Sequence, residues 1–181
     1  MGALNASKEN NKLTGVLSTL NRWDANILCY VETQTAWENF IVRDKVVREL
    51  RQRDQYAGFI GSSSEIASCD PYEPGGTMTV FDGDWSSRIS KDVDPHKLGR
   101  WSYITIKGRN QYFLTIITSY RCRKGQTKNN VGMNTAYMQQ ETILKKNGIA
   151  KSPQVIFIED MTKFIEKLTA EDHEIQHFDS R

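Results

Sequence analysis

The segment His173-Glu174-Ile175-Gln176-His177 matches the pattern His-Glu-x-x-His. On a helix this spacing places two imidazoles one turn apart, so that His173 and His177 can bind zinc while Glu174 acts as a general base. The pattern therefore predicts a zinc metalloprotease as one alternative. Two features argue against it. The usual third ligand further along the chain is missing, unless Asp179 or an upstream residue replaces it, and residues 169–172 are typical of a helix end.

A second candidate for metal chemistry is Glu32, which ends the apolar run 26–32. Such a run predicts a buried strand, and a carboxylate at its end is held rigidly. Mg²⁺ prefers oxygen ligands and keeps several waters, so one or two carboxylates and a phosphate suffice to hold it. An isolated glutamate at this place is more often an ordinary solvent-exposed charge, because exposed carboxylates are the norm.

Tyr120 ends another apolar run, 113–120, and the basic run Arg121-Cys122-Arg123-Lys124 follows it directly. Taken alone, a tyrosine at this place is typical of a half-buried aromatic side chain on a strand. Arg121, Arg123 and Lys124 could position a phosphate group. A solvated loop explains the same basic run equally well, because phosphate contacts carry no sequence signature.

The composition limits the classes of protein to which this chain of 181 residues can belong. Hydrophobic residues make up 38% and charged residues 25%, which allows one domain with a real core. The net charge of +2 is too small to indicate nucleic-acid binding by itself. No apolar run is long enough to span a bilayer. Three scattered cysteines without a Cys-x-x-Cys pair favour an intracellular, reducing compartment.

Hydrophobic periodicity and turn residues predict the elements that position these side chains. Strands close together in the sequence are expected to pair antiparallel. The order of elements predicts an α/β fold with one mixed, mainly antiparallel sheet covered by helices on one face. The segment 173–181 fits either a strand or a helical tail. Helices are predicted at 13–20, 37–53, 134–146 and from 152 onward, and strands at 26–32, 56–61, 77–81, 87–90, 101–106 and 113–120.

Several of these segments resemble the endonuclease/exonuclease/phosphatase superfamily, whose fold is a DNase I-like α/β sandwich. The strand ending in Glu32-Thr33 resembles the family's strand ending in Gln-Glu-Thr, and Gly75-Gly76-Thr77 resembles its Gly-Gly-Thr. The sequence is most similar to endonuclease domains of retroelement-type reading frames. Four further motifs carry that similarity in the same order: Gly99-Arg100-Trp101, Thr118-Ser119-Tyr120-Arg121, Thr135-Ala136-Tyr137-Met138-Gln139-Gln140 and Ile158-Glu159-Asp160-Met161-Thr162-Lys163-Phe164-Ile165.

This resemblance implies Mg²⁺-dependent phosphodiester hydrolysis of nucleic acid. It implies that Glu32 and Asn5 bind the metal and that Tyr120 and Asp179 act on the scissile phosphate. Asp179 stands where the family has an Asp-x-Asn pair at the end of a strand. We therefore expect a strand at 173–179 and phosphate contacts from the basic run after Tyr120.

The same resemblance implies that residues 1–181 form a single partial domain, half of a two-sheet, four-layer sandwich that ends after Asp179. Ser7 and Arg181 stand where the family has asparagine. These departures support an alternative, a non-catalytic remnant that serves as a structural or interaction subunit of a larger complex. Its exposed apolar sheet face would then pack on a protein partner. A retroelement origin would place the protein in the nucleus.

Overall fold

The computed structural model describes residues 24–65, 72–110, 112–124 and 135–178, together with Gly15, Ser18, Thr19 and Arg22. The predicted helix at 13–20 lies largely outside these residues. In the described part the chain is a mixed α/β protein with two antiparallel sheets of three strands each. The helices are α2 (Phe40–Arg53), α3 (Gly83–Ser86), α4 (Ala136–Lys146) and α5 (Pro153–Phe178).

The first sheet has the strand order β1-β3-β2 and the second has the order β4-β5-β6. The prediction of a single sheet is therefore wrong. Strands β3 and β4 follow one another in the chain but do not pair, because the short helix α3 carries the chain from one sheet to the other. The sequence predicted only a turn at residues 82–84, where the structure has the start of α3. The strands are β1 (Ile27–Val31), β2 (Gly58–Ser62), β3 (Thr77–Phe81), β4 (Ile89–Val93), β5 (Trp101–Lys107) and β6 (Phe113–Ser119).

The two sheets pack face to face. Phe81, Ile104 and Ile106 form the buried centre of this interface, and isoleucines from β1, β2, β4 and β6 surround them. Hydroxyl pairs also cross the interface: Thr77 Oγ1 lies 3.1 Å from Ser102 Oγ, and Thr79 Oγ1 lies 2.6 Å from Thr118 Oγ1. Each hydroxyl thus has a partner, so burying these polar groups costs little.

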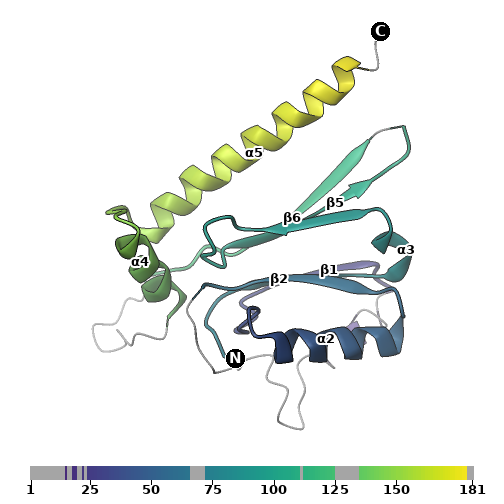
Figure 1. Ribbon diagram of the computed structural model, residues 1–181, viewed down its shortest axis with the longest axis horizontal. Helices are drawn as coiled ribbons and strands as arrows, with labels where there is room; N and C mark the ends of the chain where they lie inside the picture. The colour runs from purple at the N-terminus through teal and green to yellow at the C-terminus, as the bar shows by residue number, and fades with distance from the viewer. Residues whose placement is uncertain are drawn as a thin grey trace.

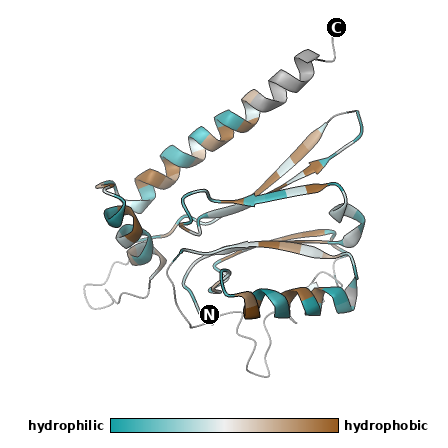
Figure 2. Cartoon of the chain, viewed as in Figure 1, coloured by the Kyte–Doolittle hydropathy of each residue, from teal (hydrophilic) through white to brown (hydrophobic). Residues whose placement is uncertain are grey.

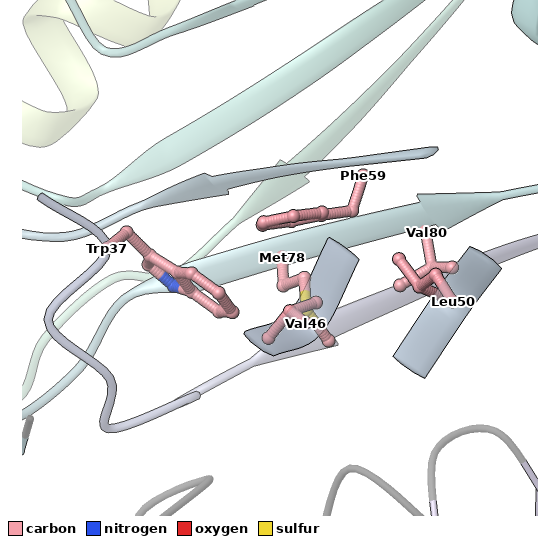
Figure 3. Close-up of a cluster of buried hydrophobic side chains, with 6 residues drawn as sticks. All are labelled: Trp37, Val46, Leu50, Phe59, Met78 and Val80. Carbon is pink, nitrogen blue, oxygen red and sulfur yellow. The ribbon is translucent and has the colours of Figure 1, made fainter. Parts of the chain in front are cut away.

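Helix α2 covers the outer face of the first sheet. Figure 3 shows this layer, in which six side chains from α2, the preceding loop, β2 and β3 pack together: Trp37, Val46, Leu50, Phe59, Met78 and Val80. Met78 and Val80 point toward α2, whereas Thr77, Thr79 and Phe81 point toward the other sheet. All five residues of β3 are consequently buried, as expected for a central strand covered on both faces.

Helix α5 covers part of the outer face of the second sheet. The Phe164 ring lies 4.8 Å from the ring of Tyr103 and 6.1 Å from that of Trp101, and Phe157 lies 6.0 Å from Trp101. The layers therefore follow the order helix, sheet, sheet, helix, with α2 and α5 on the outside (Figure 1). Hydrophobic and hydrophilic positions alternate along both helices (Figure 2), as expected for helices with one packed face.

Two helix ends differ from their predictions. Helix α2 begins at Phe40 rather than at Trp37, because Asn39 caps it by accepting a hydrogen bond from Ile41 N at 3.0 Å. Helix α5 continues to Phe178, so the predicted helix end at 169–172 and the strand expected at 173–179 are both wrong as far as Phe178. Residues 169–178 contain no glycine or proline that would stop the helix.

Within the part of the chain that the structure describes, no helix is both long and apolar enough to cross a membrane.

Candidate metal and phosphate site

Glu32 and Tyr120 lie together although they are far apart in the sequence. Glu32 directly follows β1 and Tyr120 directly follows β6, and these two edge strands lie beside each other in the facing sheets. The Glu32 carboxylate lies close enough to the Tyr120 hydroxyl to raise the pKa of that hydroxyl. The structure thus brings together two of the residues that the sequence singled out, each from a different sheet.

The backbone around Glu32 is held in an unusual conformation. Glu32 and Gln34 have φ angles of +55° and +54°, in the left-handed region that residues other than glycine rarely occupy. Two hydrogen bonds fix the turn: Thr33 N donates to Gly76 O at 3.3 Å, and Gln34 N donates to Gly75 O at 2.8 Å. The Glu32 side chain is exposed. A carboxylate open to solvent is therefore carried on a backbone that is tied to the neighbouring strand.

Gly75 and Gly76 allow the backbone to approach both site residues. Their φ angles are +84° and +81°. A Cβ atom at Gly75 would lie 3.2 Å from the Tyr120 ring and 2.9 Å from the Ala136 side chain. One at Gly76 would lie 2.7 Å from Thr33 Oγ1. The Gly-Gly-Thr motif is thus explained by close packing under the site and by a backbone conformation that favours glycine.

Tyr120 is set up as a hydrogen-bond donor. Burial raises the pKa of its hydroxyl well above the ordinary value, and the nearby Glu32 carboxylate raises the pKa further. The positive charge of Arg123 acts in the opposite direction, so this side chain lies within electrostatic range of the hydroxyl. At neutral pH Tyr120 therefore stays protonated and can donate to an anionic oxygen.

The basic run after Tyr120 borders a pocket of about 400 Å³, lined by Arg121, Cys122, Arg123, Lys124 and Gln154. The three cationic residues are exposed, whereas Cys122 is buried, with its Sγ 3.1 Å from Gln140 Oε1. Burial raises the pKa of Cys122 to about 11. The thiol is therefore a structural group, and the cations around the pocket are available for an anion.

Sequence reasoning missed the role of Arg100, which is fully buried. Its guanidinium donates to Asp94 through Nε at 2.6 Å and Nη2 at 2.9 Å, and to Asp160 on α5 through Nη1 at 2.8 Å. Its Cζ lies 4.3 Å from the centre of the Trp101 ring. Two of the quoted motifs, Gly-Arg-Trp and Ile-Glu-Asp, therefore meet in one ion pair. The available signal was an arginine directly before a predicted strand together with an aspartate on a predicted helix.

The glutamines of helix α4 also have structural roles. Gln140 Nε2 donates to Leu98 O at 3.0 Å, and Gln139 Oε1 lies 2.8 Å from Ser64 Oγ. Both glutamines are buried. They hold α4 against the loops that precede β3 and β5, beside the apolar cluster in which Tyr120 packs against Ala136 and Tyr137.

The remaining predicted ligands lie wholly or partly outside the described residues. Asn5 and Asp179 lie outside the described residues. His173 and His177 belong to α5, where a continuous helix meets the backbone requirement of the zinc pattern, but their side chains lie outside the described part. Among the residues whose side chains are described, no group of three or more His, Cys, Asp and Glu could hold a metal ion. Glu32 alone fits as one carboxylate ligand of Mg²⁺, which keeps several waters.

Comparison of the chain with protein-family models, with curated proteins and with solved structures gave no match.

Proposed function

We propose that this chain is a DNase I-like domain of the endonuclease/exonuclease/phosphatase superfamily that binds nucleic acid for Mg²⁺-dependent phosphodiester hydrolysis. One observation carries the proposal: Glu32 and Tyr120, which the family resemblance singled out independently, lie close together across the two sheets. The packing of two sheets between α2 and α5 also fits a sandwich fold, although the resemblance implied only half of such a sandwich in this chain. Neither observation depends on the other.

In this proposal Glu32 is a ligand of Mg²⁺ together with Asn5, and Asp179 acts with Tyr120 on the scissile phosphate. When bound, the ion would offset the negative charge that develops on phosphoryl oxygens. Tyr120, kept protonated by burial and by Glu32, would donate its hydroxyl proton in a hydrogen bond to a phosphate oxygen in place of the carboxylate. Such a donor stabilises charge most where water is scarce, as at this half-buried hydroxyl.

The basic pocket would then hold the neighbouring phosphates of the substrate. Arg121, Arg123 and Lys124 surround it on the chain segment that follows Tyr120 directly. Contacts of this kind set the position of a nucleic acid without selecting a base sequence. They also predict affinity that falls steeply with salt, because each neutralised phosphate releases counterions.

A plasmid-nicking assay with Mg²⁺ tests the proposal, comparing the wild-type chain with Glu32→Ala and Tyr120→Phe. Glu38→Ala is the matched control, since Glu38 is an exposed carboxylate in the same loop region. We expect nicking that EDTA abolishes, a loss of at least about 100-fold in Glu32→Ala, and no change in the control. Equal, EDTA-insensitive nicking in all variants would exclude the nuclease.

A non-catalytic interaction subunit is the second candidate, and exposed apolar side chains favour it. Val155, Ile158 and Ile165 on α5 are 44–51% exposed, and Leu114 on β6 is 58% exposed. The two sheets cover each other's inner faces, so a partner would dock on α5 and the β5–β6 hairpin rather than on a bare sheet. Sedimentation of the wild type and of Ile158→Ser/Ile165→Ser tests this. A monomer in both cases, with no complex recovered, would argue against it.

The zinc alternative rests on the helical placement of His173 and His177. Metal analysis of the purified protein decides it. Stoichiometric zinc that is lost in His173→Ala would support a zinc site on α5, and absence of zinc would remove the metalloprotease hypothesis.

A further inference from the structure

A second pocket, of about 310 Å³, opens on the opposite edge of the sandwich from Glu32 and Tyr120. Strands β2 and β4 form this edge. In the first sheet β1 and β2 are the two edge strands, and in the second sheet β4 and β6 are the two edge strands. Helix α2 borders the pocket along one side, through residues from Arg43 to Arg51. This pocket is therefore separate from the candidate metal and phosphate site.

The floor of the edge pocket is apolar. Leu50, Phe59 and Phe81 line it and are buried, and Val47 and Ile89 line it as half-buried walls. The Phe81 ring packs closely on Gly58: a Cβ atom at Gly58 would lie 2.5 Å from the ring. Aromatic and aliphatic surfaces of this kind bind the apolar part of a small ligand.

The rim of the edge pocket is cationic. Arg43 and Arg51 reach it from α2 and Lys91 reaches it from β4, and all three are exposed. No aspartate or glutamate is among the residues that line the pocket. On the same helix, Asp44 is already paired with Arg48 at 3.1 Å. In the described part of the chain, the salt bridges leave the three rim cations without a carboxylate.

Two of the rim cations, Lys91 and Arg43, lie close enough for their charges to repel each other. Lys91 Nζ donates to Phe59 O at 3.1 Å and lies 5.6 Å from the centre of the Phe81 ring. Burial lowers the pKa of Lys91, and the positive charge of Arg43 lowers it further. Cations that repel each other over an apolar floor are stabilised when an anion binds between them.

We propose that the edge pocket binds a small organic anion, with a phosphate or carboxylate head at the cationic rim and an apolar, ring-sized body on the aromatic floor. The head would contact Arg43, Arg51 and Lys91. The body would lie in the pocket against Phe59 and Phe81, which line its floor. This binding does not depend on the proposed nuclease function, since no residue is shared between the two sites.

Phenyl phosphate is the probe, and its binding to the full chain is followed by amide chemical shifts in two-dimensional NMR. Inorganic phosphate and phenol serve as comparisons, because each carries half of the recognised chemistry. We expect phenyl phosphate to bind at least about 10-fold more tightly than either, corresponding to about 1.4 kcal/mol. The shifts should centre on residues 43–51, 56–59 and 89–91.

Variants assign the binding to this pocket. Arg43→Gln and Lys91→Gln should each weaken it at least about 5-fold, whereas Arg123→Gln, at the other basic pocket, and Lys107→Gln, an exposed lysine at the end of β5, should leave it unchanged. The proposal is overturned if phenyl phosphate shows no saturable shifts at millimolar concentration. Loss of binding in Arg123→Gln but not in Lys91→Gln would overturn it equally, by assigning the ligand to the site near Tyr120.

Discussion

Replacing Arg100 with methionine tests how strongly the buried ion pair stabilises the fold and fixes α5 to the second sheet. Methionine keeps an unbranched apolar side chain that can still pack on Trp101, so the change removes mainly the guanidinium. Asp94, whose side chain is fully buried, would lose hydrogen bonds of 2.6 Å and 2.9 Å. Asp160 would lose one of 2.8 Å.

The expected loss follows from what each carboxylate retains. Removing one partner of a buried ion pair typically costs about 3–5 kcal/mol, because a charge remains buried without compensation. Asp94 still accepts hydrogen bonds from His96 N at 3.0 Å and Leu98 N at 3.3 Å. Asp160 has a side chain that is 17% exposed and can be hydrated. We therefore expect the lower end of the range, about 3 kcal/mol.

Urea denaturation followed by circular dichroism measures this loss. With a slope of about 2 kcal/mol per molar, the midpoint of Arg100→Met should fall by about 1.5 M. Asp160→Asn, which leaves the pair with Asp94 intact, should lose about 1 kcal/mol. Arg48→Met is the matched control, since Arg48 is an exposed arginine paired with Asp44 at 3.1 Å, and should lose at most about 0.5 kcal/mol. Equal losses in Arg100→Met and Arg48→Met would refute the reasoning.

Three further outcomes are expected. Gly76→Ala should lower the free energy of unfolding by about 1–3 kcal/mol more than Gly148→Ala, because both have positive φ but only at Gly76 does the new Cβ meet a neighbouring atom, at 2.7 Å; equal urea midpoints would contradict this. At pH 8, iodoacetamide should modify exposed Cys29 well before Cys122, whose pKa burial raises to about 11, and peptide mass spectrometry would reveal any equal reaction. Because the folded state raises the pKa of Tyr120, stability should fall as pH rises above about 10, and urea midpoints at pH 8 and pH 10.5 should fall less in Tyr120→Phe than in wild type.

Most strands and helices could be predicted because their signals are local. The strand Thr77–Phe81 has its predicted bounds, and β5 and β6 differ from theirs by one residue each. Turn residues such as Gly108 separate these strands, and antiparallel pairing of neighbours follows from short connections. The structure confirms the predicted α/β class, and it confirms antiparallel pairing of sequence neighbours for β2–β3, β4–β5 and β5–β6 but not for β3–β4.

The division into two sheets could not be predicted in the same way. The residue pattern of a short strand such as 77–81 is the same whether the strand pairs with the next one or packs against it across a core. The pairing depends on contacts between residues that are distant in the sequence. The same holds for the site. The sequence singled out Glu32 and Tyr120 one by one, but only the structure places them near each other. The buried pair of Arg100 and Asp160 depends on how α5 docks, which no local pattern specifies.

The candidate site lies at the interface between the two sheets. Each sheet is formed from one continuous stretch of the chain. The first sheet uses residues from 27 to 81 and the second uses residues from 89 to 119. Each can form its own hydrogen bonds before the other is present, so the contact between Glu32 and Tyr120 comes into being only when the sheets dock. A local opening between the sheets would therefore dismantle the site while leaving every strand paired. Ligand affinity at this place thus reports how tightly the two halves are closed.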